Sequence, residues 1–138
     1  VMQGESLKGY EEVALKFLEK RFPTKPQLVA SSMESITQTP LVIAVTSAIV
    51  EGDEGATKDN AFAVSTAIFS IWLMAEKLGL GMVWRTRGVG LVHEKDLHTF
   101  IGATDQEQLI GTLCIGYPAE IISTAKKRTL YTEKTTWL

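Results

Sequence analysis

Hydrophobic and polar residues alternate along the chain in patterns that predict helices first. Between Glu11 and Arg21, apolar residues recur at helical spacing among charged ones, which predicts an amphipathic helix. Phe22-Pro23 ends this helix, because the residue before a proline is disfavoured in the α region. A short second helix is expected around Leu28 to Ile36. Val1 to Gly4 has the pattern of a strand end that enters a turn.

Two continuous apolar runs predict strands that are covered on both faces. Leu41 to Val45 and Leu109 to Tyr117 lack the polar alternation of a half-exposed strand. Gly111 and Gly116 in the second run indicate that another part of the chain approaches closely. A third, shorter strand is expected from Leu80 to Trp84.

A long apolar stretch from Ala61 to Leu78 predicts the longest helix. It carries no charge up to Ala75, but it is shorter than the ~20 residues of a membrane span and contains hydroxyl side chains. We therefore expect a central, fully buried helix, with a second subunit as a further source of cover. Gly79 is placed to cap its C-terminus.

The segments around this helix complete the predicted order. Glu51 to Asn60 is polar and glycine-rich and predicts a loop, with Asp59 or Asn60 as the helix cap. His93 to Phe100 predicts an amphipathic helix that buries Leu97 and Phe100 and ends at Gly102. Strands alternating with helices, followed by a polar tail, indicate one layered α/β or α+β domain.

Composition and charge restrict the class of protein. The 138 residues are 45% hydrophobic and 22% charged, which excludes a disordered, collagen-like or coiled-coil chain. The net charge of −2 lacks the basic excess of a nucleic-acid-binding domain. A single cysteine, Cys114, cannot form an internal disulfide, and no secretory signal opens the chain, so a reducing, cytoplasmic location is expected.

Several candidate sites lack the residue pattern that their chemistry needs. His93 and His98 are five residues apart, so on a helix they point about 140° apart and do not share a metal. Cys114 lies in an apolar run, which favours a buried structural thiol. Gly79-Leu80-Gly81 lacks the third glycine of a dinucleotide fingerprint. No acid-base pair is evident, so an enzyme of this sequence would need a cofactor to supply the reactive atom.

Two basic segments remain as candidate binding groups. Arg85-Thr86-Arg87 follows a predicted strand and precedes a glycine, so guanidinium groups and turn amides can converge there on an anionic or planar ligand, beside the flat surface of Trp84. Lys126-Lys127-Arg128 could reach a phosphate, although such a cluster in a polar tail is usually solvated surface.

These segments together resemble the FMN-dependent nitroreductase family, and most closely its short, single-domain bacterial branch. The resemblance is carried by the strand after Pro40, the buried helix that leads into Leu78-Gly79-Leu80-Gly81, the Trp84-Arg85-Thr86 element, and the strand ending in Gly116-Tyr117-Pro118. It implies an α+β fold with a central, mainly antiparallel sheet flanked by helices. It also implies an intertwined homodimer that binds FMN at the subunit interface.

The resemblance implies a reaction and a set of contact residues. NAD(P)H would pass a hydride to FMN and leave, and a small-molecule electron acceptor such as a nitroaromatic, quinone or enone would then take it. Trp84, Arg85 and Thr86 would contact FMN, and a basic residue among Lys126, Lys127 and Arg128 would meet its phosphate. The end of the long helix would contact the nicotinamide nucleotide, through Met74, Ala75, Glu76, Lys77, Leu78 and Gly79.

One departure from the family pattern leaves alternatives open. The N-terminal segment with the Arg-Arg-Ser/Thr phosphate motif has no counterpart here, and Val1 to Gly4 aligns with the strand end that follows it. We therefore expect residues 1–138 to be a single nitroreductase-like domain that is incomplete at its N-terminus. The alternatives to an oxidoreductase are a flavin-binding dimer without turnover, for storage or sensing, and a non-functional remnant.

Overall fold

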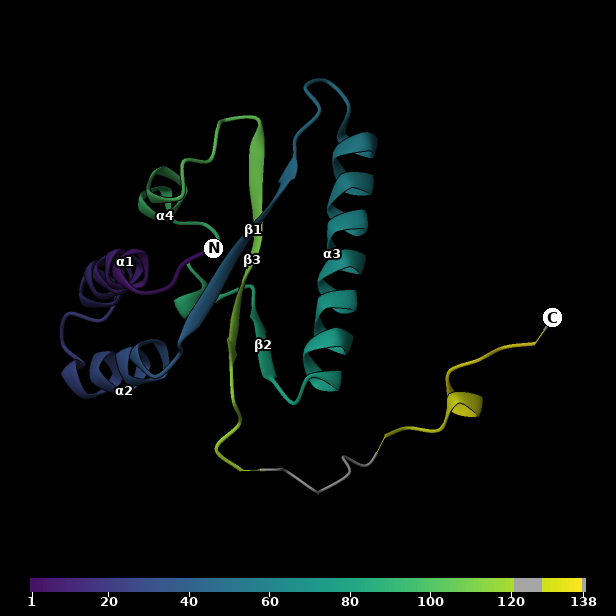
Figure 1. Ribbon diagram of the computed structural model, residues 1–138. Coiled ribbons are helices and arrows are strands. Elements are labelled where there is room, and N and C mark those ends of the chain that lie inside the picture. Colours follow the sequence, from purple (N-terminus) through teal and green to yellow (C-terminus); the bar gives the residue numbers. More distant parts are fainter. Residues whose placement is uncertain (121–127, 138) are drawn as a thin grey trace.

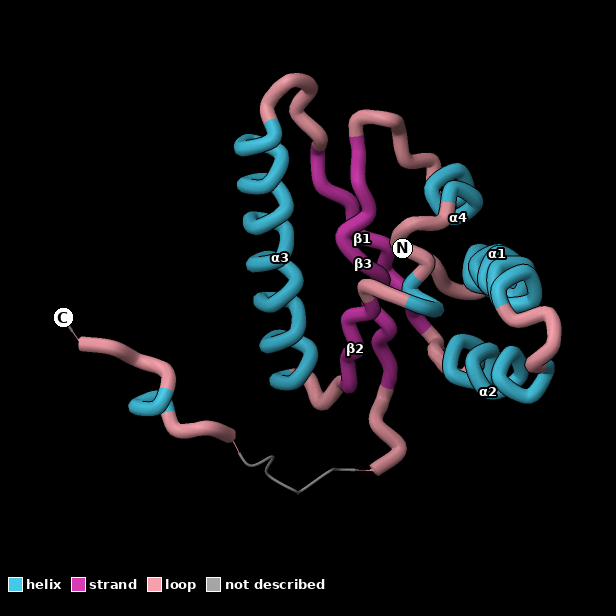
Figure 2. Tube along the Cα trace, turned by 180° about the vertical axis from the view of Figure 1, so that it is seen from behind, coloured by secondary structure: helices cyan, strands magenta, loops and turns pink. Residues whose placement is uncertain are grey.

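The computed structural model describes residues 1–120 and 128–137, and its first part forms one sheet with helices on both faces. Helix α3 covers one face, and α1, α2 and α4 cover the other, as the two opposite views agree (Figures 1 and 2). The elements in chain order are α1 (Glu5–Arg21), α2 (Pro26–Thr37), β1 (Leu41–Ala48), α3 (Glu54–Lys77), β2 (Gly81–Arg85), the 3-10 turn η1 (Gly88–Gly90), α4 (Lys95–Phe100), β3 (Glu107–Gly116) and the 3-10 turn η2 (Tyr131–Glu133).

The three strands of the described residues form an antiparallel sheet in the order β1-β3-β2. Strand β3 lies in the centre, with Cys114 opposite Val42 on β1 and opposite Val83 on β2. The central position explains why residues 111–115 are all buried, as their continuous apolar pattern predicts. The expected α+β class with a mainly antiparallel sheet is confirmed.

Each face of the sheet has its own hydrophobic core. Ile68 and Ala75 of α3 pack on Leu113 and Ile115 of β3. On the other face, residues of α1, α2 and α4 pack on Val42 and Cys114; they include Leu7, Tyr10, Ala14, Ile36 and Leu97. Side chains alternate between the faces along each strand, so neighbouring residues of β2 belong to different environments.

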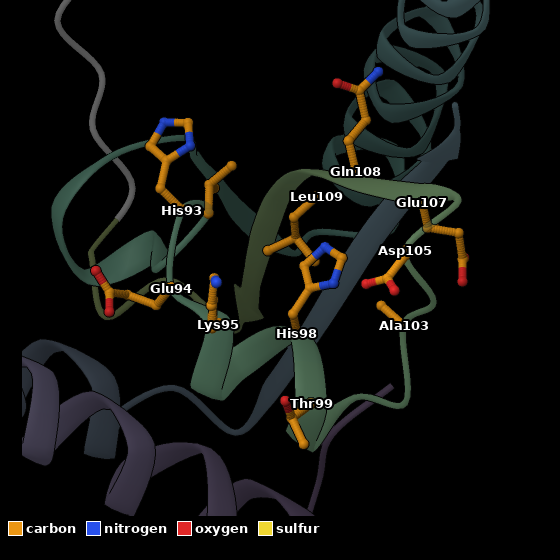
Figure 3. A pocket seen from close by; sticks show the side chains of 11 residues that line it. His93, Glu94, Lys95, His98, Thr99, Ala103, Asp105, Glu107, Gln108 and Leu109 are labelled. Carbon is orange, nitrogen blue, oxygen red and sulfur yellow. The ribbon is translucent and has the colours of Figure 1, made fainter. Parts of the chain in front are cut away.

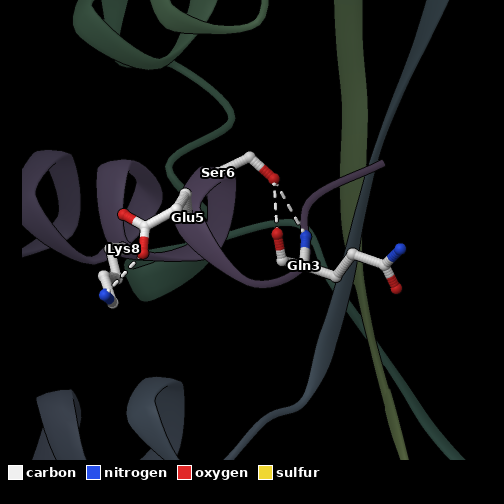
Figure 4. A network of polar contacts seen from close by, with 4 residues as sticks. All are labelled: Gln3, Glu5, Ser6 and Lys8. Carbon is white, nitrogen blue, oxygen red and sulfur yellow. Dashed lines mark hydrogen bonds and ion pairs between the residues drawn. The ribbon is translucent and has the colours of Figure 1, made fainter.

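The first helix begins six residues earlier than its apolar spacing predicts. Gly4 turns the chain at φ +56°, and Ser6 then exchanges hydrogen bonds with the Gln3 backbone, accepting from its N–H at 3.0 Å and donating to its C=O at 2.9 Å (Figure 4). The polar first turn gives no amphipathic signal, yet it forms because Leu7 and Tyr10 bury themselves against the sheet. Upstream, Met2 pairs with Val42, which confirms the predicted strand end.

The predicted loop from Glu51 to Asn60 is wrong from Glu54 onward. Helix α3 begins at Glu54, and the Asp53 side chain caps it by accepting from the Ala56 N–H at 2.9 Å. Asp59 and Asn60 lie inside the helix and are not its cap. The first helical turns are polar because they face solvent, which conceals them from a search for apolar periodicity.

The predicted full burial of α3 is also wrong for the single chain. Only Ile68 and Ala75 of this helix are buried, and the side chains of Phe62, Phe69 and Leu73 are 67%, 57% and 53% exposed. The absence of charge therefore reflects an apolar outer face and not enclosure by this chain. The expectation that a second subunit covers this apolar face stays a prediction.

Helices α3 and α4 each end at a glycine with a positive φ. After α3, the N–H of Leu80 donates to Ala75 and that of Gly79 to Glu76, and Gly79 has φ +73°, which is a Schellman ending. Gly102 ends α4 in the same way, as predicted. That helix begins at Lys95, two residues later than expected, and Phe100 at its end is 39% exposed instead of buried.

Candidate functional site

The Trp84-Arg85-Thr86 segment lies at the end of β2, and strand alternation separates its side chains. Trp84 points to the α3 face, where it packs against the core and its indole Nε1–H donates to the Ile110 carbonyl at 3.3 Å. The absence of a side chain at Gly111 makes room for the indole. Trp84 therefore packs against the core on the α3 face and, contrary to the expectation from its place in the sequence, does not lie beside the Arg85 guanidinium.

Arg85 points to the other face, toward α2, and is partly buried there. Its Nη1 donates to the Ser35 hydroxyl at 3.3 Å. Its Nε–H is buried and has no hydrogen-bond partner. A guanidinium stays charged at every ordinary pH, so a buried donor of this kind needs an acceptor.

No carboxylate of the described residues supplies that acceptor. The ion pair that these residues contain joins Lys8 to Glu5, on the surface of α1 (Figure 4). Residues 121–127, outside the described part, contain neither Asp nor Glu. Arg85 is thus a partly buried cation whose counter-charge these side chains do not provide, an arrangement that is costly unless a ligand or another chain completes it.

A cleft of about 320 Å³ opens beside this arginine. It lies between the α2–β1 connection and the ends of β2 and β3, and it is lined by Gln38, Thr39, Pro40, Gly81, Met82, Val83, Arg85, Cys114, Ile115, Gly116, Tyr117 and Pro118. The lining combines polar groups with the exposed side chains of Val83 and Tyr117, a mixture that suits a flat ligand with an acceptor edge.

Two buried groups close to Arg85 remain neutral. Burial raises the pKa of Tyr10 to about 12 and also raises the pKa of the Cys114 thiol, while the positive charge of Arg85 acts against both shifts. The expectation that Cys114 is a buried thiol is confirmed. Arg85 is therefore the charged group in a region that otherwise avoids charge.

The remaining residues expected to bind FMN do not gather around Arg85 within the described structure. Thr86 is exposed just beyond β2, and Arg128 is exposed in the tail. Lys126 and Lys127 lie outside the described residues. The phosphate contact expected of this cluster therefore stays a prediction.

The residues expected to contact a nicotinamide nucleotide form the end of α3. Met74 and Leu78 expose apolar side chains there, at 56% and 64%, and Glu76 and Lys77 are also exposed. Ala75 is buried, and Gly79 forms the helix ending described above. These two residues have structural roles, whereas the other four present side chains to solvent.

A separate polar recess of about 480 Å³ contains both histidines (Figure 3). His98 lies on α4 near Asp105 and Glu107, whereas His93 precedes the helix on the far side of the recess. The side chain of Glu107 accepts from the Thr104 N–H at 3.0 Å and from the Thr46 hydroxyl at 2.8 Å, bonds that lower its pKa. Among described residues no three His, Cys, Asp or Glu side chains are placed to hold a metal ion. None of the described helices is both long and apolar enough to cross a membrane.

Sequence reasoning did not find the residues that surround Arg85. Ser35 and Thr39 belong to α2 and its exit, about fifty residues away along the chain, and Tyr10 belongs to α1. Nothing in the local pattern around any of them indicates a shared site. Their proximity comes from two helices packing on the same sheet face as Arg85.

The free hydrogen-bond donor of Arg85 fits the chemistry of a flavin. The pyrimidine edge of a flavin offers carbonyl oxygens and ring nitrogens, which are the acceptors that the unpartnered Arg85 Nε–H lacks. The lining of the adjoining cleft also includes apolar side chains that a flat ring can contact. The Trp84 indole packs in the core on the other face of the sheet, so the FMN contact expected of Trp84 stays a prediction.

Comparison with known proteins gives a consistent result. The nitroreductase family profile matches residues 3–117. A curated protein of Bacillus subtilis, provisionally named NAD(P)H nitroreductase YfhC, is 34% identical over 77 residues, which are 56% of this chain and 38% of that protein. The chain thus matches well under half the length of this relative.

Solved structures support the same assignment. A nitroreductase-like family protein from Bacillus cereus superposes with a TM-score of 0.77 at 25% identity, over 99% of this chain and 70% of that one. A nitroreductase from Bacteroides fragilis with bound FMN has the same fold, with a TM-score of 0.63 at 18% identity, over 100% of this chain and 73% of that one. With the family profile covering most of its length, this chain belongs to the nitroreductase family.

Proposed function

We propose that the chain is a nitroreductase-type oxidoreductase that binds FMN and acts as one domain. The observation that carries this proposal is Arg85, a partly buried cation with an unpartnered Nε–H beside a cleft, in a member of the nitroreductase family. When bound, FMN would supply the redox chemistry for hydride transfer from NAD(P)H to a nitroaromatic, quinone or related acceptor.

The protein's part in this function is binding, orientation and charge. Arg85 donates to the acceptor edge of the flavin and provides positive charge where negative charge develops on reduction. The backbone of Thr86, just beyond the strand, lies close enough in sequence to serve the same edge. One basic residue among Lys126, Lys127 and Arg128 neutralises the phosphate, and Val83 offers apolar surface to the ring.

The exposed end of α3 is the proposed approach of the nicotinamide nucleotide. Met74 and Leu78 offer apolar surface for the nicotinamide ring, and Lys77 offers a charge for its phosphates. Ala75 and Gly79 stabilise this helix end, because the Ala75 carbonyl accepts from the Leu80 N–H and the Gly79 N–H donates to the Glu76 carbonyl.

We further propose that the protein is a homodimer, with the outer face of α3 in the interface. Phe62, Phe69 and Leu73 recur on one side of the helix and are more than half exposed in the single chain. Exposed apolar surface on this scale is typical of an interaction site. A second copy of the chain would cover it and supply the burial that the sequence predicts.

The first experiment tests cofactor and turnover together. The purified protein, incubated with FMN and separated from free flavin, should retain FMN and consume NADH or NADPH in the presence of a nitroaromatic or quinone. Retention of FMN without NAD(P)H consumption would favour a binding-only flavoprotein. A protein that takes up no FMN under these conditions would contradict the proposal.

The second experiment tests the assigned residue. Arg85→Ala should weaken FMN affinity by about tenfold or more, because it removes a charge-assisted hydrogen bond of roughly 1.5–3 kcal/mol. Arg87→Ala is the matched control, since it removes an exposed guanidinium two residues away. Fluorescence titration with FMN compares the two variants, and equal affinities would remove Arg85 from the flavin site.

A further inference from the structure

We infer that Tyr10, Gly90 and Thr112 are positioning residues that hold the η1 turn against the backbone of Arg85 and thereby orient its guanidinium. The inference rests on the proposed function for its consequence in flavin binding. Its structural part concerns Arg85 alone and can be tested without flavin.

Two buried hydroxyl groups hold successive carbonyl groups of the turn. The Tyr10 hydroxyl donates to the Val89 carbonyl at 2.8 Å, and the Thr112 hydroxyl, which also contacts the Tyr10 side chain, makes a longer and weaker bond of 3.5 Å to the Gly90 carbonyl. Both side chains are fully buried, at 0% exposure. The bonds come from α1 and from β3, so two elements far apart in sequence fix the same three-residue turn.

Close packing joins the turn to Arg85. A Cβ atom placed on Gly90 would lie 2.7 Å from the Arg85 carbonyl oxygen and 3.0 Å from the Arg85 Cβ, so only glycine allows this approach. On the other side, a Cβ on Gly111 would lie 3.0 Å from the same carbonyl oxygen. The backbone of Arg85 is therefore confined between two glycines.

The turn itself is in a conformation that needs such support. Leu91, directly after it, has φ +55°, which a branched apolar residue rarely adopts, and its side chain is 1% exposed. Strain of this kind persists only where surrounding contacts over-determine it. Here the contacts are the Tyr10 and Thr112 hydrogen bonds and the burial of Leu91 in the core.

The consequence concerns the direction of the guanidinium. Arg85 ends β2, where an arginine side chain on an edge strand would ordinarily extend into water. Held by the turn, it instead reaches Ser35 with its Nε–H enclosed. A donor oriented before the ligand arrives binds more tightly than one that must be ordered during binding.

A double-mutant cycle tests this role. Tyr10→Phe removes the bond to Val89 and keeps the ring, and it should weaken FMN affinity by about threefold to tenfold at a temperature where the variant is fully folded. In an Arg85→Ala background the same change should have no further effect on FMN affinity, although it should still lower Tm. Equal effects of Tyr10→Phe on FMN affinity in both backgrounds would overturn the inference.

A flavin-free measurement uses Cys114, the single cysteine, as a reporter. Arg85 acts to lower the pKa of this thiol, so a displaced guanidinium should raise the pH midpoint of its alkylation by iodoacetamide. Tyr10→Phe and Thr112→Val should raise that midpoint. Thr46→Val is the matched control, because it loses a hydroxyl bond to Glu107 at a distance from Arg85.

The two arms separate the inference from the proposed function. A wild-type protein that binds no FMN would contradict the proposed function, and the alkylation midpoint would then decide the positioning role alone. Midpoints for Tyr10→Phe and Thr112→Val that equal those of the wild type and of Thr46→Val would overturn it. Raised midpoints in both variants, with an unchanged control, would support it.

Discussion

Tyr10, Arg85 and Cys114 show how burial acts on single residues beneath one face of the sheet. The phenol and the thiol avoid the cost of a buried charge by staying neutral, since burial raises the pKa of each. Arginine has no such option, because its guanidinium does not lose its proton in proteins. The buried Nε–H of Arg85 therefore still lacks a hydrogen-bond acceptor, and a bound ligand would supply one.

The neutral state of Tyr10 has a consequence for stability at high pH. Its pKa is about 12 in the folded protein and near 10 in the unfolded chain. As the pH rises, Tyr10 therefore loses its proton in the unfolded chain first. The stabilisation of the folded state by the neutral Tyr10 phenol is complete below pH 10 and decreases as the pH rises toward 12. Between these values the wild-type protein should lose up to about 1.4 kcal/mol of unfolding free energy per pH unit from this group.

Urea unfolding at pH 9, 10.5 and 11.5 measures this effect as a difference between proteins. Tyr10→Phe has no phenol to ionise, so its stability should approach that of the wild type as the pH rises. Other groups that titrate in this range are common to both proteins and cancel in the comparison. A constant difference across the three pH values would mean that Tyr10 does not remain protonated in the fold.

At the scale of elements, helix α3 depends on a cap that lies apart from its apolar residues. Asp53 accepts from the Ala56 N–H, and Thr57 adds a hydrogen bond from its hydroxyl to the Asp53 carbonyl at 2.9 Å. Gly52, at φ +77°, turns the chain into this cap from β1. The two polar turns that follow thus belong to the helix, although their residues face solvent.

Replacing the cap should destabilise the protein measurably. Asp53→Ala removes the acceptor for an otherwise free helical N–H, and it should reduce the unfolding free energy by about 0.5–2 kcal/mol. Asp59→Ala is the matched control, since it removes an equal charge within the helix and gives a better helix former, so little or no loss is expected. Chemical denaturation of both variants distinguishes the cap from a general effect of charge.

The success of sequence prediction at this scale depends on how local each signal is. Glycine endings at Gly79 and Gly102 were predictable because the positive φ that they need is a property of one residue. The central strand β3 was predictable because both of its faces are covered. The Asp53 cap was missed because the polar turns after it carry no apolar period.

The surroundings of Arg85 could not be predicted at all from local pattern. The sequence singles out the Trp84-Arg85-Thr86 element, but strand alternation alone does not say which face α2 covers. Ser35 becomes a partner of Arg85 through packing between distant elements. Within that element, Arg85 lies beside the cleft, whereas Trp84 packs in the core on the opposite face.

At the scale of the whole molecule, the two faces of the sheet differ in how well they are covered. Among the described residues, three helices cover one face, whereas α3 alone covers the other, and the outer side of α3 is apolar and exposed. A helix that is apolar on all sides is stable in water only if something covers its outer side. A second copy of this chain, packed through Phe62, Phe69 and Leu73, would provide that cover.

Introducing a charge on this surface should separate the proposed dimer. Leu73→Glu places a carboxylate on the outer side of α3, where enclosure without a partner charge is costly, so sedimentation should shift from dimer toward monomer. Leu28→Glu is the control, because Leu28 is a comparably exposed apolar residue on α2, across the sheet, at 41%. If the wild-type protein sediments as a monomer at every concentration, the α3 surface is not a dimer interface. If Leu73→Glu and Leu28→Glu both remain dimeric, the interface lies elsewhere, and the apolar outer side of α3 needs a different partner.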